Sequence, residues 1–126
     1  MIQPHGIQRL RDLISEDRVC FLKSYERDAA LRELVKAAAD SGVCPDDQGF
    51  LTAVMDREKI VSTGIGLGVA IPHAKIPTQP DFFICVGIAP DGIDWNAIDG
   101  EPCRLVFLIG GPDNRPNDYL HVLSNL

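Results

Sequence analysis

The sequence of 126 residues contains no apolar run of membrane-spanning length and has little positive charge. Its apolar runs, such as 82–88 and 105–109, fall far short of the roughly 20 residues that a spanning helix needs, so direct membrane insertion is excluded. The formal net charge of −6 disfavours nucleic acid as a partner, because its phosphates would be repelled. The mixed, polar start lacks the pattern of a signal segment. We therefore expect a cytoplasmic, globular protein.

Paired cysteines are also missing. Cys20, Cys44, Cys85 and Cys103 form no C-x-x-C motif, and two of them lie within apolar runs. This pattern predicts free thiols in a reducing compartment. Neither His73 nor His121 has a histidine or cysteine two to four positions further on, so we expect no metal ion, and nothing indicates a cofactor.

Helix-like and strand-like segments alternate along one compact unit. Strands are expected at 19–22, 69–71, 82–88 and 105–109, with a short extended piece at 93–95; the strand 105–109 is apolar on both faces and therefore central. Helices are expected from Asp28, as a cap, to Ser41-Gly42, from Pro45-Asp46 to 56–59, and after a cap at Asn117 or Asp118. Turns are expected at 90–92 and 99–100, and a loop at 110–117. The fold class is predicted as α/β, with one domain built on a mixed sheet flanked by helices.

His73 is the residue most suggestive of chemistry. It follows three alternate glycines, Gly64, Gly66 and Gly68, and comes directly after Pro72, which fixes the backbone before it. The G-x-G-x-G spacing matches neither the dinucleotide fingerprint nor the phosphate-binding P-loop. A nucleophile or base, a metal ligand and a buried core histidine all remain open for His73 from the residues alone.

Other polar residues are ambiguous by themselves. His5 is expected to be solvated, and His121 falls in the first turn of the last predicted helix, where it needs no special role. Arg57 offers a planar fork suited to phosphate oxygens, but a cation at a helix end is also favourable without any ligand. Ser62 and Thr63 are candidate hydrogen-bond donors to a phosphoryl group, or simply turn and capping residues.

The run from Arg57-Glu58 through Ser62-Thr63-Gly64 to Ile71-Pro72-His73-Ala74 resembles the active-site signature of one family. This family is the fructose/mannitol-type (type 2) enzyme IIA domain of the bacterial phosphoenolpyruvate-dependent phosphotransferase system, including its nitrogen-regulatory branch. The resemblance extends from Val19 to the end of the chain. It continues in three further segments, namely 92–100, 106–109 and 121–123.

The resemblance implies that the protein is a phosphotransferase whose His73 accepts a phosphoryl group from the phosphocarrier protein HPr. The group then passes to a IIB partner or is held as a regulatory state that target proteins read. Arg57 matches a family arginine near the active site, and His121 matches a second histidine beside the first. The alternative is a non-catalytic sensory or binding module that keeps the same fold.

Family domains continue for a further helix or two beyond the segment around His121. The resemblance therefore implies that residues 1–126 form a type-2 IIA domain that is either truncated at its C-terminal end or naturally short. The missing helices would normally cover apolar surface, and an exposed patch of this kind can pair with another chain. The oligomeric state is left open by this expectation.

Overall fold

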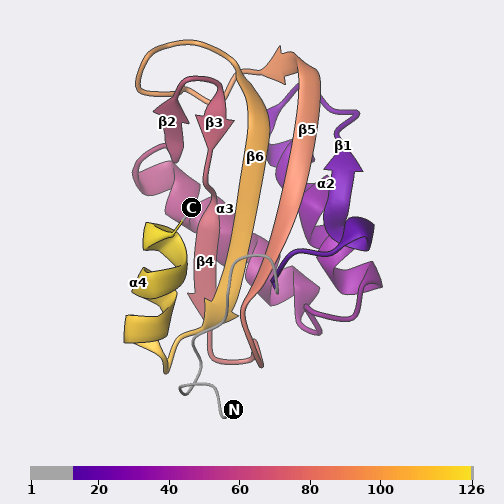
Figure 1. The fold of residues 1–126 in the computed structure, drawn as a ribbon, viewed down its shortest axis with the longest axis vertical. Helices are drawn as coiled ribbons and strands as arrows, with labels where there is room; N and C mark the ends of the chain where they lie inside the picture. Colours follow the sequence, from indigo (N-terminus) through magenta and orange to yellow (C-terminus); the bar gives the residue numbers. More distant parts are fainter. Residues whose placement is uncertain (1–12, 126) are drawn as a thin grey trace.

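A mixed sheet runs through the middle of the molecule in the computed structural model, which describes residues 13–125 (Figure 1). Hydrogen bonding gives the strand order β1-β5-β6-β3-β2, and β4 also pairs with β6. The described elements are η1 (Glu16–Arg18), β1 (Val19–Phe21), α2 (Arg27–Asp40), α3 (Asp47–Ile60), β2 (Gly64–Gly66), β3 (Val69–Ala70), β4 (His73–Ile76), β5 (Phe83–Ile93), β6 (Cys103–Pro112) and α4 (Pro116–Ser124).

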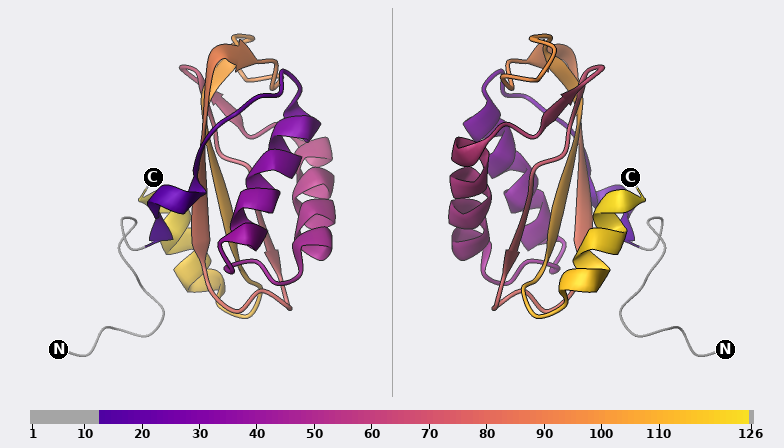
Figure 2. Two further views of the ribbon diagram at one scale, coloured as in Figure 1. Left: turned by 90° about the vertical axis from the view of Figure 1, so that its right-hand side faces the viewer. Right: turned by 90° about the vertical axis from the view of Figure 1, so that its left-hand side faces the viewer.

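Helices cover both faces of this sheet. Figure 2 shows α2 and α3 on one face, with α4 and η1 on the other. A large apolar cluster that includes Leu34, Phe50 and Trp95 packs between the sheet and α2 and α3. A smaller one, which includes Ile109 and Tyr119, lies beneath α4. The predicted α/β architecture is confirmed. Within residues 13–125, no helix is both long and apolar enough to cross a membrane.

Strand β6 organises the region around His73. It pairs antiparallel with β5 and parallel with both β3 and β4, which confirms the predicted central position of 105–109. The register sets His73 opposite Ile109. Among the described strands β4 pairs only with β6, and residues of β4 line a cavity together with residues of α3 and α4.

The predicted helix signals were correct for α3 and for the end of α2. The carboxylate of Asp46 accepts a hydrogen bond from the backbone N–H of Gly49 at 3.1 Å and caps α3. Gly42 follows α2 with φ of +83°, a conformation that glycine adopts without strain.

The predicted caps of the other two helices were wrong. Glu26, and not Asp28, precedes α2 as its N-cap, and the Glu26 side chain makes no capping hydrogen bond; Asp28 instead pairs with Arg27 Nε at 3.1 Å. Helix α4 begins at Pro116, before both predicted caps. Proline suits the first helical position because its fixed φ is already helical. It also lacks an N–H, and the N–H at this position has no partner within the helix.

Two predicted irregular segments belong to strands. The turn expected at 90–92 lies within β5, which continues to Ile93 through a register irregularity after Ile88. The first three residues of the loop expected at 110–117 complete β6. Glycine and proline at these positions therefore mark a bulge and a strand end, which composition alone does not separate from a turn.

Gly110, on β6 opposite Ala74, leaves no room for a side chain. A Cβ there would lie 2.2 Å from Phe83 Cε2 and 3.0 Å from Phe50 Cε1, and both rings are fully buried. We expect Gly110→Ala to lower the free energy of unfolding by about 1–3 kcal/mol through overpacking. Urea unfolding would measure this, and Phe83→Leu combined with Gly110→Ala should recover part of the loss. Additive effects of the two substitutions would contradict the assigned contact.

Candidate functional site

His73 begins β4 directly after Pro72, whose carbonyl accepts the backbone N–H of Ile109 at 3.0 Å. Pro72 is also fully buried, so a hydrogen bond and close packing both fix the backbone that leads into His73. The imidazole is half-buried and lies beside the ring of Tyr119 on α4, with centroids 6.0 Å apart. The histidine is therefore held on a paired strand with its ring at the border of the sheet and α4.

A single hydrogen bond defines the chemistry of this imidazole. Nδ1 of His73 lies 2.8 Å from the carbonyl oxygen of Ile71. A carbonyl can only accept, so the geometry assigns the proton of the neutral ring to Nδ1 and leaves the lone pair on Nε2. Burial lowers the pKa of His73 and the charge of Arg57 lowers it further, while the bond to Ile71 and the charge of Glu58 oppose the shift. The neutral form of the ring is therefore favoured, and its nucleophilic nitrogen is Nε2.

A cavity of about 280 Å³ opens where α3, β4 and α4 meet. The described residues that line it are Ala53, Arg57, His73, Ala74, Lys75 and Tyr119. Two of them are cations and none carries a carboxylate, in a chain whose net charge is −6. Such a lining favours an anionic group next to His73.

Arg57 and Lys75 reach this cavity from different elements. Arg57, half-buried in the last turn of α3, donates from Nη1 to the carbonyl of Val61 at 3.0 Å, which anchors one edge of its guanidinium. Lys75 stands two residues after His73 on β4, with its Nζ 5.3 Å from the centroid of Tyr119. The motif pointed to Arg57, whereas Lys75 was missed. The available signal was strand alternation, which puts His73 and Lys75 on one side of β4.

Ser62 and Thr63 make hydrogen bonds inside the protein and are not among the described residues of the cavity lining. Ser62 Oγ donates to the carbonyl of Trp95 at 2.8 Å and accepts the N–H of Gly64 at 3.1 Å. Thr63 is buried, and its hydroxyl donates to the carboxylate of Glu58. A phosphoryl contact for either residue stays a prediction.

His121 lies in the last turn of α4, and the expected position in the first turn is wrong. The helix is short and starts at Pro116, so His121 is close to its C-terminal end, where free carbonyls and not free amides are found. Its side chain is exposed and is not among the described residues of the cavity lining. A role beside His73 stays a prediction, and His5 lies outside the described residues.

The four cysteines are free thiols, as predicted. Burial raises the pKa of Cys85 to about 12 and those of Cys44 and Cys103 to about 11. None of these three thiols forms an appreciable thiolate at neutral pH, so they make poor nucleophiles. Among residues 13–125, no group of three or more His, Cys, Asp or Glu side chains is placed to hold a metal ion.

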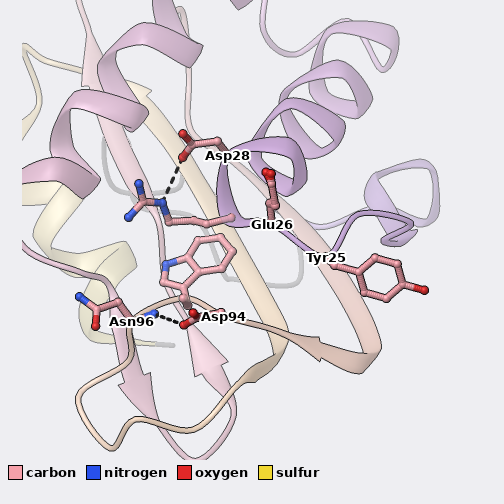
Figure 3. Close-up of a pocket in the computed structure, with 7 residues that line it drawn as sticks. Tyr25, Glu26, Asp28, Asp94 and Asn96 are labelled. Carbon is pink, nitrogen blue, oxygen red and sulfur yellow. Dashed lines mark hydrogen bonds and ion pairs between the residues drawn. The ribbon is translucent and has the colours of Figure 1, made fainter.

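A second hollow, of about 340 Å³, lies at the N-terminal end of α2 and has the opposite character. Figure 3 shows the carboxylates of Glu26, Asp28 and Asp94 around it. Arg27, its one cation among the described lining residues, is paired with Asp28 at 3.1 Å. This hollow suits an anion poorly, so the cavity beside His73 is the better of the two for an anionic group.

Comparison with known proteins identifies the family of this chain. The family model described as "Phosphoenolpyruvate-dependent sugar phosphotransferase system, EIIA 2" matches residues 12–126. The PTS system fructose-specific EIIABC component of Bacillus subtilis is 37% identical over 105 residues, which make up 83% of this chain and 16% of that protein. The chain thus spans a small part of that relative's length.

Solved structures share the fold. The nitrogen regulatory protein IIA-Ntr from Neisseria meningitidis superposes with a TM-score of 0.84 at 23% identity, covering 91% of this chain and 79% of that one. The IIA mannitol enzyme of Escherichia coli, solved in complex with phosphorylated IIB mannitol, superposes with a TM-score of 0.72 at 19% identity, covering 89% and 79%. With a family model matched along nearly its whole length and the fold shared, this chain belongs to the EIIA type 2 family of the phosphoenolpyruvate-dependent sugar phosphotransferase system.

Proposed function

We propose that the chain carries a phosphoryl group on Nε2 of His73, accepts it from phospho-HPr and passes it to a IIB domain. The observation that carries this proposal is the bond from Nδ1 to the Ile71 carbonyl, which leaves the lone pair of the neutral imidazole on Nε2. In the transfer, the N–P bond of the donor breaks as the bond from phosphorus to Nε2 forms. The proton on Nδ1 stays in place, and the Ile71 carbonyl stabilises the positive charge that develops on the ring.

Arg57 and Lys75 are the groups proposed to neutralise the transferred phosphoryl oxygens. Phosphoryl transfer depends mainly on positioning and on charge stabilisation, with little covalent work for the protein. The guanidinium of Arg57 is tethered at one nitrogen to Val61, so its other N–H groups are held near the cavity. Lys75, which rests near Tyr119, supplies a second positive charge on the side of α4.

The identity of the two partners is part of the proposal. IIB as acceptor is supported by the IIA mannitol relative, which forms a complex with phosphorylated IIB mannitol. The same phosphohistidine, retained and not passed on, would serve as the regulatory state of the nitrogen branch. Transfer to a IIB domain of the fructose class within seconds would favour the transport role. Stable retention of the phosphoryl group in the presence of this IIB domain would favour the regulatory role.

The decisive test is incubation of the protein with phosphoenolpyruvate, enzyme I and HPr. We expect one acid-labile phosphate per chain, located on His73 by mass spectrometry under alkaline conditions. Omission of HPr should prevent its incorporation. Absence of phosphate with all components present would support the alternative, a binding module without catalytic activity.

The lowered pKa of His73 also leads to a prediction about pH. Titration of its ring protons by NMR should give a midpoint below 6.5, the ordinary value for histidine. The unfolded chain then binds the additional proton first as pH falls, so this group's contribution to stability is present above pH 6.5 and is lost as pH drops through the folded-state pKa. Arg57→Ala should raise the midpoint, because it removes a nearby positive charge. A midpoint at or above 6.5 in the wild-type protein would contradict the burial assigned to the ring.

A further inference from the structure

The pairing of β2 with β3 leaves one backbone carbonyl unused by the hairpin. The register sets Gly64 opposite Ala70, and therefore Thr63 opposite Ile71. The N–H of Ile71 donates to the carbonyl of Thr63 at 3.0 Å. In a regular antiparallel ladder, a pair joined in this way exchanges both of its bonds, and the N–H of Thr63 would bind the carbonyl of Ile71.

The second bond of that pair is replaced by two others. The N–H of Thr63 donates to Oε2 of Glu58 at 3.1 Å. The carbonyl of Ile71 accepts from Nδ1 of His73 at 2.8 Å. The Glu58 carboxylate therefore binds the N–H of Thr63, and the imidazole of His73 binds the carbonyl of Ile71. In a regular ladder these two backbone groups would be hydrogen-bonded to each other.

Glu58 is well held in this arrangement. Its side chain belongs to a residue that is only 3% exposed, and a buried carboxylate is tolerated only when it is hydrogen-bonded. The hydroxyl of Thr63 donates to its other oxygen, and Trp95 Nε1 donates to that same hydroxyl at 3.3 Å. Two neighbouring residues of α3 therefore lie on different sides of the site. Arg57 lines the cavity, and Glu58 lies in the interior.

We propose that Glu58 is a positioning residue for His73. By accepting the N–H of Thr63, it leaves the carbonyl of Ile71 to Nδ1 of His73 and so fixes the tautomer that carries the lone pair on Nε2. Thr63 contributes its backbone and hydroxyl to this arrangement and has no need to touch the phosphoryl group. The consequence for transfer rests on the proposed function, whereas the consequence for the tautomer does not.

The test compares Glu58→Leu with Glu58→Gln. Leucine fills the buried volume but offers no acceptor, so the N–H of Thr63 returns to the carbonyl of Ile71 and competes with the imidazole. We expect the ring nitrogen shifts of His73, read in two-bond proton–nitrogen spectra, to reveal a substantial population with the proton on Nε2. Phosphorylation by phospho-HPr should slow on the order of tenfold, the lower end of the loss seen when a metal-binding histidine loses its orienting partner. Glutamine keeps an oxygen for Thr63 and should retain the wild-type tautomer.

A second measurement needs no variant and decides the matter if Glu58→Leu fails to fold. Scalar couplings across backbone hydrogen bonds in the wild-type protein should connect Ile71 nitrogen with Thr63 carbonyl carbon. They should not connect Thr63 nitrogen with Ile71 carbonyl carbon. A coupling of the second kind, or an unchanged His73 tautomer in a folded Glu58→Leu protein, would overturn the proposal.

These measurements distinguish the positioning role of Glu58 from the phosphoryl-carrier function. They also distinguish it from a direct phosphoryl contact of Thr63. If the wild-type protein accepts no phosphate, the proposed function fails, while the tautomer and the couplings still report on Glu58. Thr63→Val gives the second distinction. A direct phosphoryl contact predicts slower transfer with an unchanged ring in the free protein, whereas a positioning role predicts that any loss of rate is accompanied by a shift in the tautomer.

Discussion

Replacing His73 with alanine is expected to abolish phosphate incorporation from phosphoenolpyruvate, enzyme I and HPr. The other described side chains around the cavity offer no comparable acceptor, because Arg57 and Lys75 are cations and Tyr119 is a phenol whose pKa burial raises. The fold should survive, since the imidazole is half-buried and the backbone of β4 is held by β6. Intact-mass measurement at alkaline pH reports the phosphate, and circular dichroism with urea unfolding reports the fold.

A control strengthens this experiment. His73→Gln keeps a polar side chain of similar reach but removes the nucleophile, and it should be equally inactive. Stoichiometric phosphate on the alanine variant, mapped to any other residue, would refute the assignment of His73 as the acceptor.

The second large effect is expected for Arg57→Ala. Removing one preorganised donor to a developing anion costs about 100-fold in rate in other enzymes, and the guanidinium is anchored in advance by Val61. Arg57→Lys should recover only part of the rate, because an ammonium group cannot contact two phosphoryl oxygens in one plane. Quenched-flow measurement of transfer from phospho-HPr would give both rates.

Arg32→Ala provides the matched control for Arg57→Ala. Arg32 is exposed on α2 and is not among the described residues of the cavity lining, so this change alters the net charge equally without touching the site. Equal losses in the two alanine variants would show that overall charge, and not a contact at the cavity, controls the rate.

Much of the fold followed from local patterns, because those patterns carry their own physical cause. The apolar run in β6 predicted a strand that is covered on both faces. The carboxylate of Asp46 predicted the N-cap of α3. Helix α4 was misplaced because Asn117 and Asp118 are good caps in isolation, whereas Pro116 already occupies the first helical position and Asp118 pairs with Arg115 at 3.0 Å. Because α4 also ends at Ser124, His121 falls in its last turn and not in its first.

The site was only partly predictable for a similar reason. A motif located His73 and Arg57, but roles that depend on tertiary partners could not be read from it. The ammonium group of Lys75 lies near the ring of Tyr119, a residue that is distant in sequence. Thr63 had the chemistry of a phosphate ligand, and only the buried carboxylate of Glu58 shows where its hydrogen bonds go.

The cavity beside His73 is assembled from Ala53 on α3, from β4 and from Tyr119 on α4, which are widely separated along the chain. Contacts between distant segments carry a loop-closure entropy that must be overcome before they contribute stability. The two parallel pairings of β6 with β3 and β4 have the same long-range character. A nascent or partly folded chain would therefore possess His73 without the surroundings that make it reactive. The proposed reactivity of His73 therefore requires the folded arrangement of these three segments and is no property of the local sequence alone.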